Sequence, residues 1–302
     1  MSKAKMEKSS SEEMLITQKY DKRSRLGEIW HRMKQNKGSI VGLCIVVALI
    51  LTMFASLIFI SYDDVTAMNS SNRFAQPSLK HPFGTDDKGR DLFLRTLYGT
   101  RYSLVIGVAA VAVALTLGLL FGATAGFFGG IVEDVIMRAA DILSSIPATL
   151  LGMVIVITLG QSLMNLVLAI SVTATPAFIR ITRASVLTVK TNEFVEAARS
   201  IGISNIRIIF TQVVPNGLSP VIVTMTTRIG GAILESAGLS FLGFGIPVPE
   251  PEWGALVSAG RNFIRIAPHL TIFPGIFIMI TVLAFNTMGD GLRDALDPKL
   301  KR

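Results

Sequence analysis

The chain has 302 residues, of which 50% are hydrophobic and 17% are charged, and its mean hydropathy is positive at +0.55. This composition excludes an ordinary soluble globular protein and favours a membrane protein. The formal net charge of +8 does not indicate nucleic-acid binding, because the basic residues lie outside the long apolar runs, as in segments that face anionic lipid head groups. The single cysteine excludes an internal disulfide.

The first third of the chain predicts a polar tail, one span and a connector. Residues 1–38 carry ten Lys or Arg residues and suggest a tail that ends in a short amphipathic helix. Residues 39–60 have no charge over 22 residues, enough for a first transmembrane helix, since a hydrocarbon core needs about 20 helical residues. This run is too long for a cleaved signal peptide. Residues 61–101 are mixed in character and predict an extracytoplasmic connector with turns.

Five further spans are expected within residues 102–289. Residues 102–132 are uncharged and end at GFFGG, which predicts a flexible turn. Residues 142–179 are 38 uncharged positions, about twice the length of one span, and we divide them near Gly160.

The last two spans are expected at residues 216–245 and 270–288. The fifth span is interrupted by Arg228 and Glu235, and the sixth is followed by a polar, basic tail at residues 290–302. Four prolines in or near the spans predict kinks: Pro147, Pro176, Pro220 and Pro274. Neighbouring helices can supply hydrogen-bond partners for the backbone carbonyls that a kink frees.

These runs are continuous and do not alternate, so they predict helices and not barrel strands. The expected fold is an all-α membrane protein with six transmembrane helices and both termini on one side. That side, counted over residues 1–38, 180–212 (around the loop at residues 190–215) and 290–302, carries nineteen Lys or Arg residues, against eight on the other. The excess predicts that the termini and this loop are cytoplasmic.

The loop between the fourth and fifth spans predicts a helical hairpin. Asn192 can cap a short helix, and the adjacent Ala197 and Ala198 leave one face almost bare for another backbone. Gly202 can take the left-handed conformation that ends a helix, and Ser204 can cap a second helix. On these grounds alone, an ordinary amphipathic loop remains equally possible.

The spacing of Glu-Ala-Ala, three residues, Gly, and then Pro thirteen positions later resembles the EAA loop of ABC-importer permeases. In that family the short helix of the loop docks into a cleft of a cytoplasmic ATPase subunit. The resemblance implies that the matching residues transmit force and perform no covalent chemistry: Glu196, Ala197, Ala198, Gly202 and Pro215.

Two further segments narrow the resemblance to one kind of permease subunit. Residues 81–104, HPFGTDDKGRDLFLRTLYGTRYSL, and residues 235–261, ESAGLSFLGFGIPVPEPEWGALVSAGR, are similar to one permease subunit of dipeptide, oligopeptide and nickel importers. That subunit is the one usually encoded second. With the six-span layout, the resemblance covers roughly residues 30–298 and implies the type I ABC importer permease fold.

The resemblance implies an assembly in a bacterial or archaeal plasma membrane. A homologous second permease, two ATPase subunits and an extracytoplasmic solute-binding protein are the expected partners in the bilayer, with no nucleic acid. Dipeptides or oligopeptides are the expected substrates, and nickel chelates or glutathione-like peptides remain alternatives. ATP and Mg²⁺ are expected in the ATPase subunits, and none is expected on this chain, whose sequence has no Walker A pattern.

Charged residues inside spans are costly, so they suggest function. Arg228 and Glu235 lie seven residues apart, nearly on one helical face, and either line the passage or serve packing. Asp141 and Arg138 suggest an ion pair at the membrane boundary. A solvated external turn is expected for the charged residues Asp86, Asp87, Arg90 and Asp91.

Two other classes of protein fit the sequence less well. An ion-driven transporter needs a buried cluster of proton- or sodium-binding groups on broken helices in two inverted halves, and no such repeat is visible. A membrane enzyme needs a nucleophile–base or metal constellation, and the three histidines have no ligand spacing. We therefore expect no catalytic residue and no metal site.

Overall fold

The computed structural model describes residues 25–296, which form helices and loops and contain one isolated β-bridge. Five helices are long and apolar enough to cross a membrane, and a bent pair of helices makes a sixth candidate. The predicted all-α fold with six spans is therefore confirmed. Residues 1–24 and 297–302, most of the two predicted tails, lie outside the described part.

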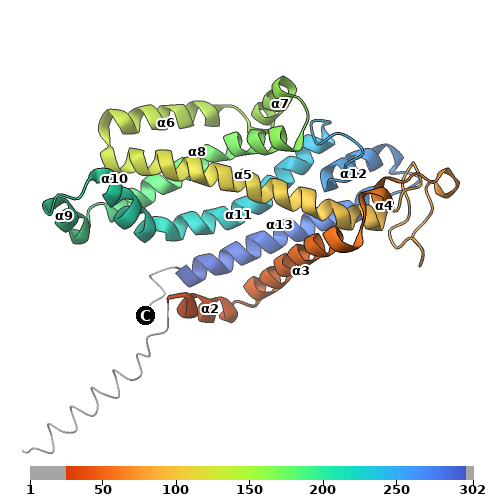
Figure 1. The fold of residues 1–302 in the computed structure, drawn as a ribbon, viewed down its shortest axis with the longest axis horizontal. Coiled ribbons are helices and arrows are strands. Elements are labelled where there is room, and N and C mark those ends of the chain that lie inside the picture. The colour runs from red at the N-terminus through yellow and green to blue at the C-terminus, as the bar shows by residue number, and fades with distance from the viewer. Residues whose placement is uncertain (1–24, 297–302) are drawn as a thin grey trace, which may run out of the picture.

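The elements of the described chain, in order, are α2 (Arg25–Gln35), α3 (Lys37–Phe59), α4 (Tyr62–Thr66), η1 (Ser70–Asn72), α5 (Leu92–Phe128), α6 (Gly130–Ser145), α7 (Ala148–Leu159), α8 (Leu163–Val189), α9 (Glu193–Ser200), α10 (Asn205–Ile208), the π-helix η2 (Ile209–Val213), α11 (Val214–Phe241), α12 (Trp253–Gly260), η3 (Arg261–Phe263) and α13 (His269–Leu296). The long helices run side by side along the longest axis of the molecule (Figure 1).

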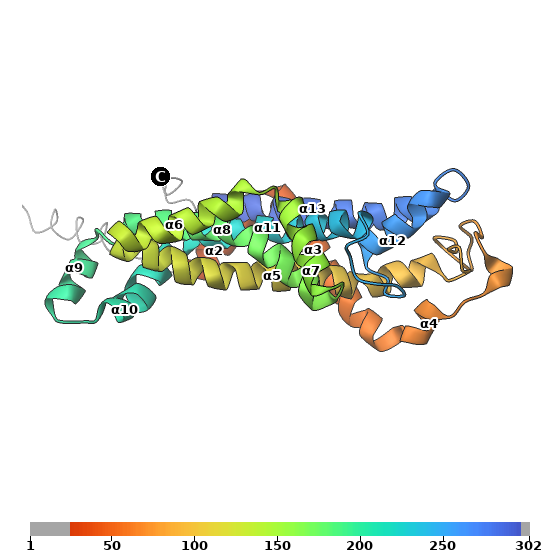
Figure 2. The same cartoon turned by 90° about the horizontal axis from the view of Figure 1, so that it is seen from above.

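The two ends of this bundle differ. One end carries α2, α9 and α10, and we call it the hairpin end (Figures 1 and 2). The opposite end carries α4, α12 and the loops beside them, and we call it the connector end. The predicted amphipathic helix before the first span is α2, which packs against α13 at the hairpin end.

The helix of the second span begins at Leu92, ten residues before the predicted start of the apolar span at residue 102. Asp91 accepts a hydrogen bond from the Leu94 backbone N–H at 3.0 Å and starts the helix there. Arg95 and Arg101 had suggested an aqueous connector. Arg95 is instead buried, with its Nε 3.8 Å from the Asp86 carboxylate, so the helix carries its charge inside the protein.

The third span is a bent pair of helices, α6 and α7, and not a straight helix that begins at residue 142. The turn before it lies at GFFGG, where Gly129 has φ +69° and ends α5. The two helices meet at an angle of 89° at Pro147, in agreement with the predicted kink. The predicted division near Gly160 is also confirmed, because α7 ends at Leu159.

Ion pairs between α6 and α8 explain why the charged residues did not end these helices. Arg183 pairs with Glu133, and Arg180 Nη2 lies 2.9 Å from Asp141 Oδ1. Asp141 thus pairs across to α8, and the predicted partner Arg138 is exposed. Because these arginines have carboxylate partners, α8 continues to Val189, past the predicted end at residue 179.

The last two spans agree with the prediction near their starts. The fifth, α11, ends at Phe241, and the sixth, α13, continues as far as Leu296. Residues 290–296, which we had assigned to the polar tail, therefore belong to the last helix. The helices continue through the three other prolines: Pro176, Pro220 and Pro274.

The most extensive helix contact lies between α5 and α8, and it includes three glycines spaced four residues apart. Gly118, Gly122 and Gly126 form one face of α5, and all three are buried. A Cβ at Gly122 would lie 2.5 Å from the carbonyl oxygen of Ile179, and one at Gly126 would lie 2.9 Å from Val186 Cβ. Such small-residue faces let helix backbones approach within a membrane.

We predict that Gly122→Ala lowers the melting temperature of the detergent-solubilised protein, because the added methyl group forces the two backbones apart. Overpacking of this kind costs about 1–3 kcal/mol. Gly275→Ala in α13 is the matched control, since a Cβ there would meet nothing within 4 Å. Equal melting temperatures for the two variants would contradict the importance of this contact.

Candidate functional site

The predicted helical hairpin is present as α9 and α10 at the hairpin end of the bundle (Figure 2). Gly202 follows α9 with φ +80°, the left-handed conformation that we expected. Its N–H donates to the Arg199 carbonyl at 2.9 Å, and the Ile203 N–H donates to the Ala198 carbonyl at 3.1 Å. This pair of bonds is a Schellman motif, which fixes the angle between α9 and the next segment.

The two residues expected to cap the hairpin helices occupy the N-cap positions but do not cap with their side chains. Neither Asn192 nor Ser204 makes a side-chain cap hydrogen bond. Their backbone carbonyls accept instead, from Val195 N at 2.9 Å and from Ile208 N at 3.0 Å. The helix boundaries were therefore right and the capping mechanism was wrong.

The two alanines do not form one bare face, as the sequence suggested. Ala198 is buried against the bundle, whereas Ala197 is exposed. Consecutive helical residues point about 100° apart, so adjacent alanines serve different faces. Ala198 packs in one hydrophobic cluster with Val195 and with the ends of α5 and α8, at Phe127 and Val186. The small side chain thus lets the hairpin lie close to its own bundle.

Polar contacts reinforce this attachment of the hairpin. The Arg199 guanidinium lies over the Phe127 ring, 4.9 Å from its centroid. Lys190 Nζ donates at 2.7 Å to the Gly126 carbonyl and so caps the end of α5. With the hydrophobic cluster, these contacts tie the hairpin to the ends of α5 and α8.

The outer surface of the hairpin exposes large apolar side chains beside charged ones. Ile201 is 77% exposed and Ile206 is 67% exposed, and Phe194 and Phe210 are also exposed. Clustered exposed apolar side chains of this kind mark protein interaction sites. Of the other residues that the motif singled out, Glu196 is exposed on α9 and Pro215 is exposed in the first turn of α11.

The two charged residues of α11 share a face, as predicted. Arg228 is exposed near the middle of the helix, and Glu235 is half-buried towards the connector end. The Thr173 hydroxyl of α8 donates to Glu235 Oε1 at 3.0 Å, a contact that the sequence did not predict. Each charge costs about 2.5–3.5 kcal/mol at the centre of a membrane helix, so both indicate a protein-lined or watered surface.

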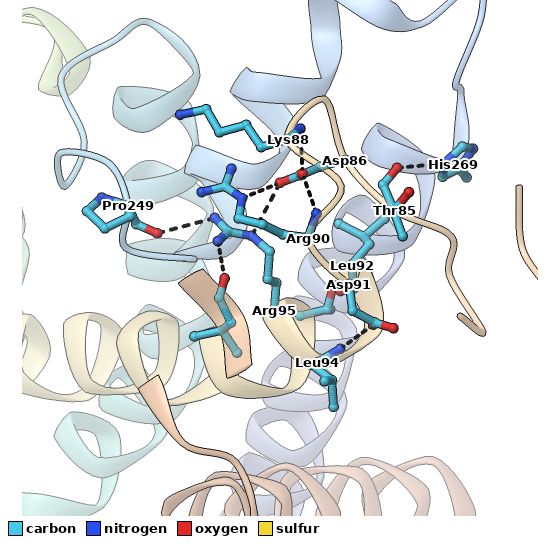
Figure 3. A network of polar contacts seen from close by, with 12 residues as sticks. Thr85, Asp86, Lys88, Arg90, Asp91, Leu92, Leu94, Arg95, Pro249 and His269 are labelled. Carbon is cyan, nitrogen blue, oxygen red and sulfur yellow. Dashed lines mark hydrogen bonds and ion pairs between the residues drawn. The ribbon is translucent and has the colours of Figure 1, made fainter. Parts of the chain in front are cut away.

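At the connector end, the predicted solvated turn is instead a buried ion-pair network (Figure 3). Asp86 Oδ2 accepts from Arg90 Nε at 2.7 Å, while Asp86 Oδ1 accepts from the backbone N–H groups of Lys88 and Arg90 at 2.9 Å. Asp86 is 8% exposed and Arg90 is 4% exposed. The prediction of a solvent-exposed turn was therefore wrong, because Asp86 is buried together with arginines that neutralise its charge.

Arg95 connects this network to two other segments of the connector end. Its Nη1 donates to the Val65 carbonyl at 2.6 Å, and its Nη2 donates to the Pro249 carbonyl at 3.2 Å (Figure 3). Asp91 Oδ2 also lies 2.7 Å from His81 Nδ1. Segments far apart in the chain thus converge on α5.

The loop between α11 and α12 is partly interior. Trp253 is fully buried, and its indole Nε1 donates to the Thr96 carbonyl at 2.9 Å. Glu252 caps α12 by accepting from Ala255 N at 2.9 Å, and its burial raises the pKa of its carboxyl above the ordinary value. Within residues 25–296, no three His, Cys, Asp or Glu side chains are grouped to hold a metal ion.

Comparison with known proteins agrees with this architecture. Residues 118–302 match the family described as the binding-protein-dependent transport system inner membrane component, and residues 24–77 match the N-terminal transmembrane domain of oligopeptide transport permease C. The chain belongs to this family of ABC importer permeases. It is therefore a multi-pass membrane protein and a permease subunit.

Relatives of this permease are similar over nearly their whole length. It is 46% identical to the dipeptide transport system permease protein DppC of Alkalihalophilus pseudofirmus, over 91% of this chain and 90% of that protein. It is 41% identical to the oligopeptide transport system permease protein OppC of Bacillus subtilis, over 90% and 88%. It is 39% identical to the glutathione transport system permease protein GsiD of Pectobacterium atrosepticum, over 91% of each.

Among solved structures, the permease resembles a chain from the inward-facing MetNI methionine ABC transporter. The TM-score is 0.53 at 19% identity, and the match covers 68% of this chain and 96% of the other. At this identity the likeness shows the fold alone. The predicted ABC importer permease fold is confirmed.

The network at the connector end of the permease predicts a large effect for one isosteric change. Asp86→Asn removes the carboxylate beside Arg90 and Arg95, and loss of one partner of a buried pair costs about 3–5 kcal/mol. We expect a clearly lower melting temperature in detergent. Asp63→Asn is the control, because Asp63 is exposed at the same end. If both variants melt like the wild type, the network does not stabilise the fold.

Proposed function

We propose that this permease forms half of the translocation pathway of an ATP-driven importer of dipeptides or oligopeptides. Support comes from the two relatives whose names specify dipeptide and oligopeptide transport, both above 40% identity. The glutathione permease at 39% identity makes glutathione-like peptides the second candidate substrate. Nickel chelates remain a third, on the resemblance of the sequence alone.

The permease acts in an assembly with three kinds of partner protein. A homologous second permease completes the pathway, two ATPase subunits bind and hydrolyse ATP with Mg²⁺, and a solute-binding protein delivers the peptide from outside. The hairpin end faces the cytoplasm, since the Lys and Arg excess lies on the side of the hairpin and the termini. This chain supplies no nucleotide site, because its sequence has no Walker A pattern.

The hairpin is the coupling element, and the observation that carries the proposal is its attachment to the bundle on one face with exposed apolar side chains on the other. Its apolar outer residues dock on an ATPase subunit, and its inner face is tied to α5 and α8 through the cluster around Ala198. Movement of the ATPase pair is thereby transmitted to the spans. The residues proposed to serve this coupling are Glu196, Ala197, Ala198, Gly202 and Pro215.

The α11 face with Arg228 and Glu235 lines the translocation path. Both charges lie at membrane depth on a surface where this chain leaves open space, because a Cβ at the intervening Gly231 would meet nothing within 4 Å. Lipid is a poor neighbour for two charges, whereas a watered path between two permeases accommodates them. An ion-driven mechanism needs a cluster of such groups and is the weaker candidate.

The coupling role predicts different outcomes for two substitutions of Gly202. Its φ of +80° is costly for a β-branched residue, by about 1–3 kcal/mol, while Asn tolerates this conformation. In proteoliposomes with all partner subunits, we expect Gly202→Val to lose the stimulation of ATPase activity by the loaded binding protein and to reduce uptake. Gly202→Asn should keep both.

A Cβ at this position touches nothing within 4 Å, so the two variants should insert and assemble equally well, which purification of the complex checks. Normal stimulation in Gly202→Val would contradict the coupling role.

A further inference from the structure

Two sets of charges inside the described spans differ in their pairing. On the hairpin side of the bundle, α6 and α8 neutralise each other through the pairs of Arg183 with Glu133 and Arg180 with Asp141. In contrast, Arg228 and Glu235 take part in no ion pair within 4.0 Å among residues 25–296. The two charges attract each other along α11 without forming an ion pair, so both side chains keep hydrogen-bonding groups for a ligand.

Their geometry places them on one face at a defined separation. Seven residues of α-helix span about 10.5 Å along the axis and complete nearly two turns. Gly231 lies between them on the exposed side of α11 and presents no side chain. Glu235 Oε1 is oriented by the Thr173 hydroxyl, and Glu235 Oε2 accepts no hydrogen bond from the described residues. The face is thus an open surface with an oriented carboxylate at one end and an exposed guanidinium at the other.

We propose that Glu235 and Arg228 bind the two termini of a short peptide during its passage, with the α-ammonium group at Glu235 and the α-carboxylate at Arg228. This inference rests on the proposed function. It adds the class of peptide and the orientation in which the peptide passes. An extended chain spans about 3.3–3.6 Å per residue, so two or three residues cover about 7–11 Å. The spacing of the two residues along the helix axis is comparable to the length of a dipeptide or tripeptide with free ends.

The chemistry of the two side chains agrees with these roles. A carboxylate accepts hydrogen bonds from an ammonium group, and a guanidinium binds a carboxylate with two parallel bonds. Glu235 lies nearer the connector end and Arg228 nearer the hairpin end. The peptide therefore passes with its carboxylate towards the hairpin end. A second permease that pairs with both charges is the competing explanation.

Uptake of end-blocked peptides by the complete transporter tests the inference. Proteoliposomes that contain all subunits receive dialanine, its N-acetyl derivative or its C-terminal amide, each with saturated binding protein. The uptake rate of free dialanine divided by that of each blocked form gives two selectivity ratios. Because every assay uses the same binding protein, its own selectivity cancels when variants are compared with the wild type.

We expect Glu235→Gln to lower the ratio for the N-acetyl derivative about tenfold and to leave the ratio for the amide unchanged. Arg228→Gln should do the reverse, since a hydrogen bond to a charged group is worth about a tenfold change or more. Arg138→Gln is the control, because Arg138 is an exposed arginine of α6 outside this face. It should change neither ratio.

Three other outcomes would each contradict the inference or the proposed function. Wild-type ratios in both α11 variants would overturn the inference while leaving the proposed function intact. Loss of the second permease from the purified complex in these variants would assign the charges to the subunit interface and also overturn it. A wild-type transporter that takes up none of the three peptides on addition of ATP would instead contradict the proposed function.

Discussion

The contact on which the rest of this structure depends is the approach of α5 and α8 at the three glycines of α5. It lets two long helices meet backbone to backbone at Gly122 and Gly126, where any side chain would separate them. The hairpin is built on the ends of this helix pair through Ala198 and its neighbours. Towards the connector end, α8 presents Thr173 to Glu235 of α11. One packing contact therefore positions both candidate functional surfaces.

Charged side chains in this permease are also positioned by contacts between elements. Buried or membrane-level charges that serve the fold have partners on another element, as Arg183 has Glu133 and Arg95 has Asp86. A charge without a partner in its own chain costs free energy, so it is retained where a ligand or subunit completes it. The paired charges of α6 and α8 and the two charges of α11 are thus distinct sets within one bundle.

Much of this could be predicted from the sequence, since apolar runs and a left-handed glycine depend on local chemistry. The spans and the turn at Gly202 are examples. The errors in the ends of the spans share one cause: a charge was taken to end a span, while Arg95 and Arg180 in fact lie within helices because distant carboxylates neutralise them. The glycine spacing of α5 is visible in the sequence, but its partner, α8, is set by tertiary packing.

The most direct test is a distance measurement within the assembled transporter. Spin labels at Ser200 of α9 and Val113 of α5, both exposed, report whether the hairpin and the helix pair move as one body after Cys44→Ser removes the native thiol. The account predicts the same distance distribution in the nucleotide-free and ATP-bound states. A clear shift between those states would show that the hairpin moves independently of α5, and force would then reach the spans by another route.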